Sequence, residues 1–113
     1  MKYHFPGLIF IFIFCFITPT LIAQHQVNKK ALKLQELAFI HFRQNDTTNA
    51  LEFALESIQK DSLYASPLVL AGNIYEMHEQ IELAAQFYRK ALELSPDEFN
   101  HLFYALAEME VKL

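Results

Sequence analysis

An internal repeat of 34 residues is the feature that most limits how this chain can fold. Residues 31–64 align with residues 65–98, and a third copy begins at Phe99. The paired positions carry similar side chains, as in Leu34 and Leu68, Ala50 and Ala84, and Phe53 and Phe87. A unit of this length buries its apolar face only by stacking on a neighbour. We therefore expect a row of stacked units.

Within each copy the pattern is helical. Apolar residues recur three and four positions apart, as at Leu51, Ala54, Leu55 and Ile58. Beyond residue 24 the chain contains one glycine, Gly72, and alternation typical of strands is missing. The pattern predicts an all-α fold with helices at about 26–43, 48–60, 66–78, 81–94 and 96–112.

Several residues signal where these helices begin. The stretch RQNDTTN ends the first helix and offers Asp46 or Thr47 as the N-cap of the second. Ser66 places a capping hydroxyl before a proline at the first helical position. Ser95 and Glu98 have the spacing of a capping box, which predicts that the last helix begins there.

The second copy resembles the tetratricopeptide repeat, a family of helix–turn–helix units with this period. It matches the family pattern in order at Leu68, Ala71, Gly72, Tyr75, Ala84, Tyr88, Ala91 and Pro96. Leu68 and Ala71 depart from the tryptophan and leucine that the family favours. The first copy departs further, with His41, Ala54, Ser57 and Ser62 at pattern positions. The resemblance covers residues 27–113.

The resemblance implies tandem antiparallel helix hairpins that form a short right-handed α-solenoid. Repeat 1 would span about 31–64, repeat 2 about 65–98 and a terminal helix 99–113, within a domain at 24–113. It also implies packing roles for Gly72, Tyr75, Ala84, Tyr88, Ala91 and Pro96. A glycine inside a helix costs about 1 kcal/mol relative to alanine. We expect Gly72 and Ala84 to offset that cost by letting two helices approach closely.

Residues 1–23 have the order of features found in a secretory signal peptide. Lys2 precedes the apolar run LIFIFIFCFI at 8–17, and Pro19 and Ala23 follow. Cleavage after Ala23 would make the protein exported, either periplasmic or secreted, and would remove its one cysteine. An uncleaved membrane anchor is the competing interpretation, because residues 5–23 approach the length of about 20 apolar residues that spans a bilayer.

The sequence carries no motif that predicts catalysis, a cofactor or a metal. HEQIE at 78–82 resembles the zinc motif H-E-x-x-H, but Glu82 replaces the second histidine and the segment lies in an expected turn. Gly-rich phosphate loops and nucleophile elbows are missing. A net charge of −4 without clustered basic residues argues against a nucleic-acid partner. We therefore expect a non-enzyme.

The resemblance further implies a concave groove, lined by the first helix of each hairpin, that binds a peptide or a partner helix. By family position its residues are Leu32, Gln35, Phe39, Phe42, Arg43, Ser66, Val69, Asn73, Glu76, Met77, Asn100, Phe103 and Ala107. Each apolar one could instead belong to the core or to packing between repeats. Gln35 and Val69 stand where a clamp for acidic peptides would need cations, so an apolar or helical ligand is expected.

Together these features predict an exported, non-catalytic protein-interaction module. The alternatives are the extracytoplasmic sensor portion of a membrane-anchored signalling protein, or a fragment of a longer array. The last helix carries apolar residues on more than one face, which is typical of an array that docks a partner, a second copy of itself, or further repeats. A membrane would be a partner only through an uncleaved N-terminal segment.

Overall fold

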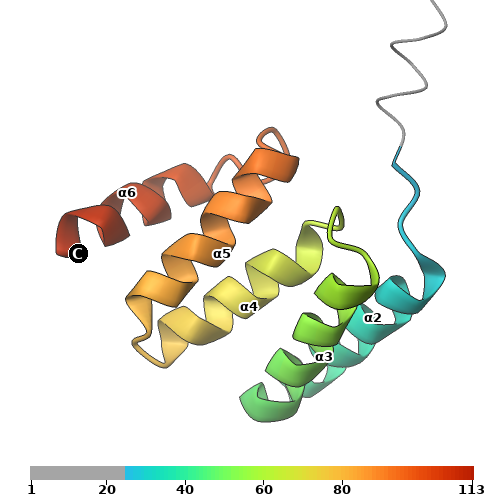
Figure 1. Ribbon diagram of the computed structural model, residues 1–113. Helices are drawn as coiled ribbons and strands as arrows, with labels where there is room; N and C mark the ends of the chain where they lie inside the picture. The colour runs from blue at the N-terminus through green and yellow to red at the C-terminus, as the bar shows by residue number, and fades with distance from the viewer. Residues whose placement is uncertain (1–24) are drawn as a thin grey trace, which may run out of the picture.

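The structure is a computed structural model that describes residues 25–113. All regular structure within that range is α-helical, as the periodicity predicts (Figure 1). The helices are α2 (Lys29–Arg43), α3 (Thr47–Lys60), α4 (Ser66–Met77), α5 (Ile81–Leu94) and α6 (Leu102–Lys112). The predicted signal peptide and its cleavage site lie outside the described residues.

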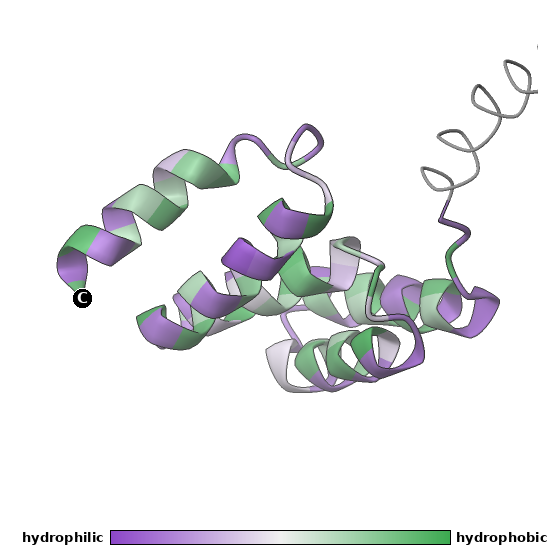
Figure 2. Ribbon diagram, turned by 45° about the horizontal axis from the view of Figure 1, so that its top comes forward, coloured by the Kyte–Doolittle hydropathy of each residue, from purple (hydrophilic) through white to green (hydrophobic). Residues whose placement is uncertain are grey.

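Each helix packs on the next one along the chain. α2 lies against α3 and α4 lies against α5, and the two pairs meet where α3 contacts α4 (Figure 1). α6 packs on α5 at the far end of the row. Apolar and polar residues are interspersed along each helix (Figure 2), and several large apolar side chains are exposed, among them Phe39, Met77 and Phe103.

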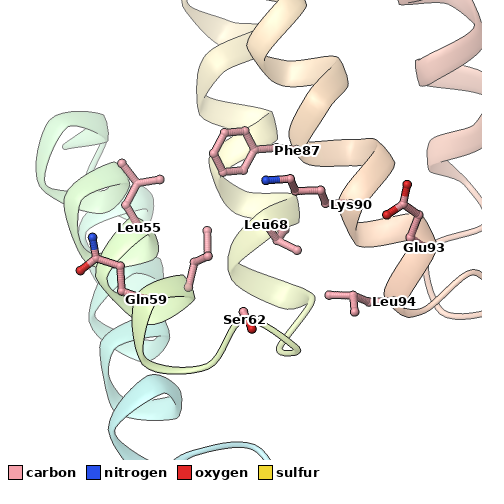
Figure 3. Close-up of a pocket in the computed structure, with 9 residues that line it drawn as sticks. Leu55, Gln59, Ser62, Leu68, Phe87, Lys90, Glu93 and Leu94 are labelled. Atoms are coloured by element: carbon pink, nitrogen blue, oxygen red, sulfur yellow. The ribbon is translucent and has the colours of Figure 1, made fainter.

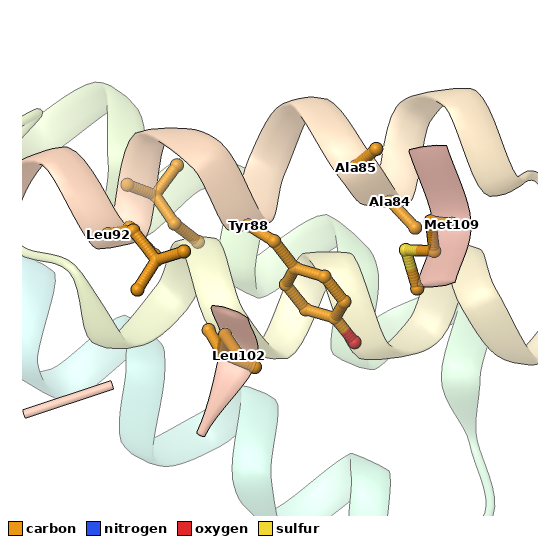
Figure 4. Packing of buried hydrophobic residues seen from close by; sticks show 8 residues of the cluster. Ala84, Ala85, Tyr88, Leu92, Leu102 and Met109 are labelled. Carbon is orange, nitrogen blue, oxygen red and sulfur yellow. The ribbon is translucent and has the colours of Figure 1, made fainter. Parts of the chain in front are cut away.

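Two clusters of buried side chains hold the row together. The first joins α2, α3 and α4 through Ala38, Ala50, Ala54, Leu70 and Ile74. The second joins α4, α5 and α6 through Leu68, Ala84, Ala85, Tyr88, Ala91, Leu92, Leu102 and Met109 (Figure 4). α4 contributes to both clusters, which explains why its sequence is apolar on most sides.

The repeat in the sequence recurs in the turns inside each helix pair. Asn45 and Glu79, which are 34 positions apart, both have a positive φ, at 61° and 62°. The next residue in each turn donates its backbone N–H to a carbonyl five residues back, Asp46 to His41 and Gln80 to Tyr75, both at 2.9 Å. This is the Schellman arrangement that ends many helices. The two pairs therefore turn in the same way.

The repeat also recurs as an aromatic pair within each helix pair. The rings of His41 and Phe53 stack with centroids 5.3 Å apart, and those of Tyr75 and Phe87 lie 5.3 Å apart at a tilt of 42°. Both partners are shifted by 34 residues between the two pairs. His41 therefore occupies the position that Tyr75 has in the other helix pair, and its ring packs against Phe53.

α3, α4 and α5 begin within one residue of their predicted starts, whereas α2 and α6 begin later than predicted. Asp46 caps α3 and accepts a hydrogen bond from the N–H of Asn49 at 3.2 Å. α2 begins at Lys29, three residues later than predicted, because the Asn28 side chain caps the N–H groups of Lys30 and Ala31. Ser66 does not cap α4, whose N-cap is Ala65, and its hydroxyl instead accepts a hydrogen bond from Gln35.

The predicted start of the last helix at Pro96 is wrong. Ser95 is the C-cap of α5, and residues 96–101 form turns before α6 begins at Leu102. The N–H groups of Leu102 and Phe103 bond to carbonyls only three residues back, so the helical ladder does not reach further upstream. The Phe99 side chain meanwhile packs against the second core cluster, which holds this segment as a turn.

Candidate functional site

Gly72 lies at the closest approach between α4 and α5. It is buried, and a methyl group built on it would lie 2.6 Å from Cδ1 of Tyr88 and closer still to Cε1. Real side chains do not reach such distances, so the ring of Tyr88 occupies the space that a side chain at 72 would need. The atoms nearest to a side chain at 72 therefore belong to Tyr88, one turn further along α5 than the predicted neighbour Ala84, which is fully buried.

The hydroxyl of the buried Tyr88 ring reaches two polar side chains of α4. The phenol O–H lies 2.5 Å from Oδ1 of Asn73 and 2.9 Å from Oε2 of Glu76, both of which can accept its proton. Burial, followed by the hydrogen bond and the charge of Glu76, raises the pKa of Tyr88 far above its usual value. The hydroxyl therefore stays protonated, and its one proton is shared between Asn73 and Glu76 as alternative acceptors.

Asn73 and Glu76 line an open cavity together with Phe42 and Met77. This cavity, which we call the α2–α4 groove, has a volume of about 430 Å³ and is formed by one residue of α2 and three of α4. Met77 is 59% exposed and Phe42 is half-buried. The groove therefore offers apolar walls around a carboxylate whose position is set from inside the protein.

A second, smaller cavity continues beyond α4 towards α6. It has a volume of about 130 Å³, and its lining comprises Glu76, Ile81, Ala105, Glu108, Met109 and Lys112. Glu76 is the one residue that lines both cavities. A ligand extended across α2, α4 and α6 would pass this side chain.

The other predicted groove residues have mixed positions. Leu32, Phe39 and Arg43 are exposed on one stripe of α2, since they lie seven and four residues apart. Phe103, 53% exposed on α6, lines neither cavity. Val69 is half-buried and packs against the second core cluster, which matches its alternative interpretation as a packing residue.

Gln35 is wrong as a groove residue. It is 2% exposed, and its amide donates a hydrogen bond to the Ser66 hydroxyl at 3.3 Å. Its position on α2 faces the start of α4 and not solvent. Pro96 is wrong as a packing residue because it is exposed in the turn after α5. Ala84 and Ala91 are fully buried, and Tyr75 is half-buried against Phe87.

The sequence interpretation missed Asp61 as a structural residue. Asp61 is the C-cap residue of α3, where its backbone N–H donates to the carbonyl of Ser57. Its carboxylate accepts hydrogen bonds from the N–H groups of Asn28 and Leu63, at 2.9 and 3.1 Å, and from the His25 ring at 2.9 Å. The backbone bond from Asn28 is the main cause that lowers the pKa of Asp61. No local pattern announces this contact, because it joins residues 33 and 36 positions apart.

Within residues 25–113 no group of three or more histidine, cysteine, aspartate or glutamate side chains is arranged to hold a metal ion. His78, the first residue of the HEQIE segment, lies 3.1 Å from the hydroxyl of Thr47 instead. None of the helices in this range is both long enough and apolar enough to cross a membrane. Comparison with protein-family models and with curated protein sequences finds no significant match for the chain.

Proposed function

We propose that the protein is an exported, non-catalytic interaction module of the tetratricopeptide-repeat type. The observation that carries this proposal is the α2–α4 groove, where Tyr88 positions Asn73 and Glu76 between Phe42 and Met77. A side chain fixed by a buried hydroxyl loses little further freedom when a partner binds, and such preorganisation favours affinity.

The internal symmetry supports the family part of the proposal. The turns at Asn45 and Glu79, and the aromatic pairs that follow them, recur at the interval that the sequence predicts. Helices that repeat with one connecting geometry stack into a superhelix with a continuous inner surface. We infer a short right-handed solenoid in which α2, α4 and α6 form that inner surface.

The chemistry of the groove indicates the class of partner. Glu76 is an exposed carboxylate without an ion pair among the described residues, and apolar side chains flank it. A peptide or helix that places an apolar side chain between Phe42 and Met77, and a lysine or arginine at Glu76, would satisfy both features. A second copy of this chain remains a candidate for the same groove.

Site-directed photocrosslinking tests the groove. A crosslinking residue at Met77 is expected to capture one partner from the exported fraction, whereas the same residue at Val111, which is 89% exposed on α6, captures it much less. Glu76→Gln removes the charge but keeps an acceptor for Tyr88, so it is expected to reduce the captured amount about two- to fivefold. Glu52→Gln, on the exposed side of α3, is the matched control.

Equal capture from Met77 and Val111, or equal losses in the Glu76 and Glu52 variants, would overturn the groove. Export is tested separately by sequencing the N-terminus of the accumulated protein. A start at Gln24 supports release after cleavage, and an intact Met1 supports the membrane-anchored alternative.

A further inference from the structure

A third cavity lies between α3 and α5, over the start of α4. It has a volume of about 550 Å³ and shares no residue with the α2–α4 groove. Its apolar walls are Leu55 and Ile58 on α3, Leu68 on α4, and Phe87 and Leu94 on α5 (Figure 3). Cavities that bind small molecules have volumes of about 300–1,000 Å³, mostly apolar walls and a few polar groups.

The polar groups of this cavity are not distributed evenly. Gln59 and Ser62 stand on the α3 side, and Lys90 and Glu93 stand on α5. The Lys90 side chain extends from α5 towards Phe87 and the middle of the cavity, with Glu93 further along the helix (Figure 3). Among residues 25–113 Lys90 forms no ion pair, including with Glu93. The ammonium group of Lys90 therefore lies beside the apolar walls of the cavity without a counter-ion.

These features identify the chemistry that would complete the site. An apolar body would cover Ile58, Leu68 and Phe87, and an anionic end would pair with Lys90. The carboxylate of Glu93 would repel an anionic head group placed next to it. The head group of a ligand is therefore expected at Lys90, on the side of the cavity that faces Gln59 and Ser62. We propose that this cavity binds a long-chain carboxylate, with its alkyl chain on the apolar walls and its carboxylate at Lys90.

The lining of the cavity suits an alkyl chain that ends in an anion, because five apolar side chains from three helices surround it and Lys90 is its one cation. An alkyl chain is thin and flexible enough to follow the trough between α3 and α5. The proposal does not rest on the protein-binding function, because the two sites have different linings.

Tryptophan fluorescence can locate the ligand, because the chain contains no tryptophan. The purified Leu55→Trp variant would carry its one indole in the cavity wall, and Phe39→Trp would carry it on the exposed stripe of α2. A bromine-labelled long-chain carboxylate, used below its micelle concentration, is expected to quench the first indole and not the second. Equal quenching of both, or quenching of neither, would overturn the site.

Calorimetry on the unmodified protein tests the head group without altering the cavity. Hexadecanoate is expected to bind, and hexadecanol to bind about two- to fivefold more weakly, since it lacks the charge that pairs with the exposed Lys90. Lys90→Gln should weaken hexadecanoate by the same factor and leave hexadecanol unchanged. Lys33→Gln on α2 makes the same chemical change outside the cavity and should have no effect.

Hexadecanoate and hexadecanol binding with equal affinity would overturn the role of Lys90, and no heat with either would overturn the site. Circular dichroism of the Lys90 variant, whose side chain is exposed, checks that it stays helical. Crosslinking from Met77 should be unaffected by Lys90→Gln. Failure of this proposal is therefore distinguishable from failure of the protein-binding groove.

Discussion

The α2–α3 and α4–α5 pairs have the same connecting turn, but side chains of different size fill the contact between the two helices of each pair. Where α4 and α5 bring Gly72 against Tyr88, the equivalent positions of α2 and α3 hold Ala38 and Ala54, both fully buried in one cluster. A large ring opposite a glycine and two methyl groups opposite each other divide the available space differently. Close packing therefore constrains the pair of residues jointly, and neither position alone.

The first pair adds polar ties that the second lacks. The buried Ser57 hydroxyl donates to the carbonyl of Ala31 at 2.7 Å, whereas its equivalent in the second pair is Ala91. Asp61 then binds the segment before α2, and its equivalent is Ser95. The first pair is thus held by small side chains plus hydrogen bonds at these two positions, and the second by the aromatic ring of Tyr88 and its hydroxyl.

The largest expected effect comes from removing that ring. Tyr88→Ala should lower the free energy of unfolding by about 3–5 kcal/mol, because it leaves a cavity beside Gly72 in the second core cluster. Denaturant unfolding followed by circular dichroism measures the change. Tyr104→Ala on α6 is the control, since that ring is 84% exposed and its loss should cost less than about 0.5 kcal/mol. Similar losses in both variants would contradict the central role of Tyr88.

Adding a side chain at Gly72 should have the next largest effect. Gly72→Leu is expected to cost about 1–3 kcal/mol through overlap with the Tyr88 ring, in spite of the better helix propensity of leucine. In the Tyr88→Ala background the leucine would enter vacated space, so the same substitution should cost less than about 1 kcal/mol there. Equal costs in both backgrounds would show that another residue excludes the side chain.

Asp61→Asn tests the polar ties of the first pair. The folded protein lowers the pKa of this carboxyl below its unfolded value of about 3.9, so the ionised form stabilises the fold at every pH above that value. The stabilisation is lost as the pH falls through the lowered folded-state pKa. We expect the variant to be about 1–2 kcal/mol less stable near neutral pH, with a difference that shrinks under acid conditions.

Unfolding curves at about pH 7 and about pH 3 provide this comparison, with the exposed Asp97→Asn as control. If Asp61→Asn lowered the free energy of unfolding by the same amount at both pH values, the negative charge of Asp61 would not be the source of its stabilising effect.

The smallest expected effect concerns the two equivalent turns. Glu79 and Asn45 have the same left-handed backbone, but asparagine tolerates this conformation better than glutamate. Glu79→Gly should therefore stabilise the protein by about 0.5–1 kcal/mol, and Asn45→Gly by less. Thermal unfolding of both variants measures the order. A larger gain at Asn45 would contradict the equivalence of the turns.

The helical class and most helix bounds could be predicted because they depend on local pattern. Periodic apolar residues and the Asp46 cap act within a few positions. The start of α6 could not, since Ser95 and Glu98 carry a local capping pattern while the packing of Phe99 on the second core cluster decides the outcome. Tertiary contacts overrode local preference there.

The candidate site was predictable in part for the same reason. Family positions located Phe42, Asn73, Glu76 and Met77, which line one cavity. They also included Gln35, whose burial depends on how α4 approaches α2. The hydroxyl of Tyr88 on α5 contacts residues 12 and 15 positions away on α4, and no spacing rule contains that contact.

α4 contributes side chains to both buried clusters, and this affects how the protein unfolds. Leu70 and Ile74 belong to one cluster and Leu68 belongs to the other. Unfolding of α4 would therefore expose apolar surface of both clusters to water at the same time. The halves of such a short row cannot denature in turn, so heat should produce a single sharp transition.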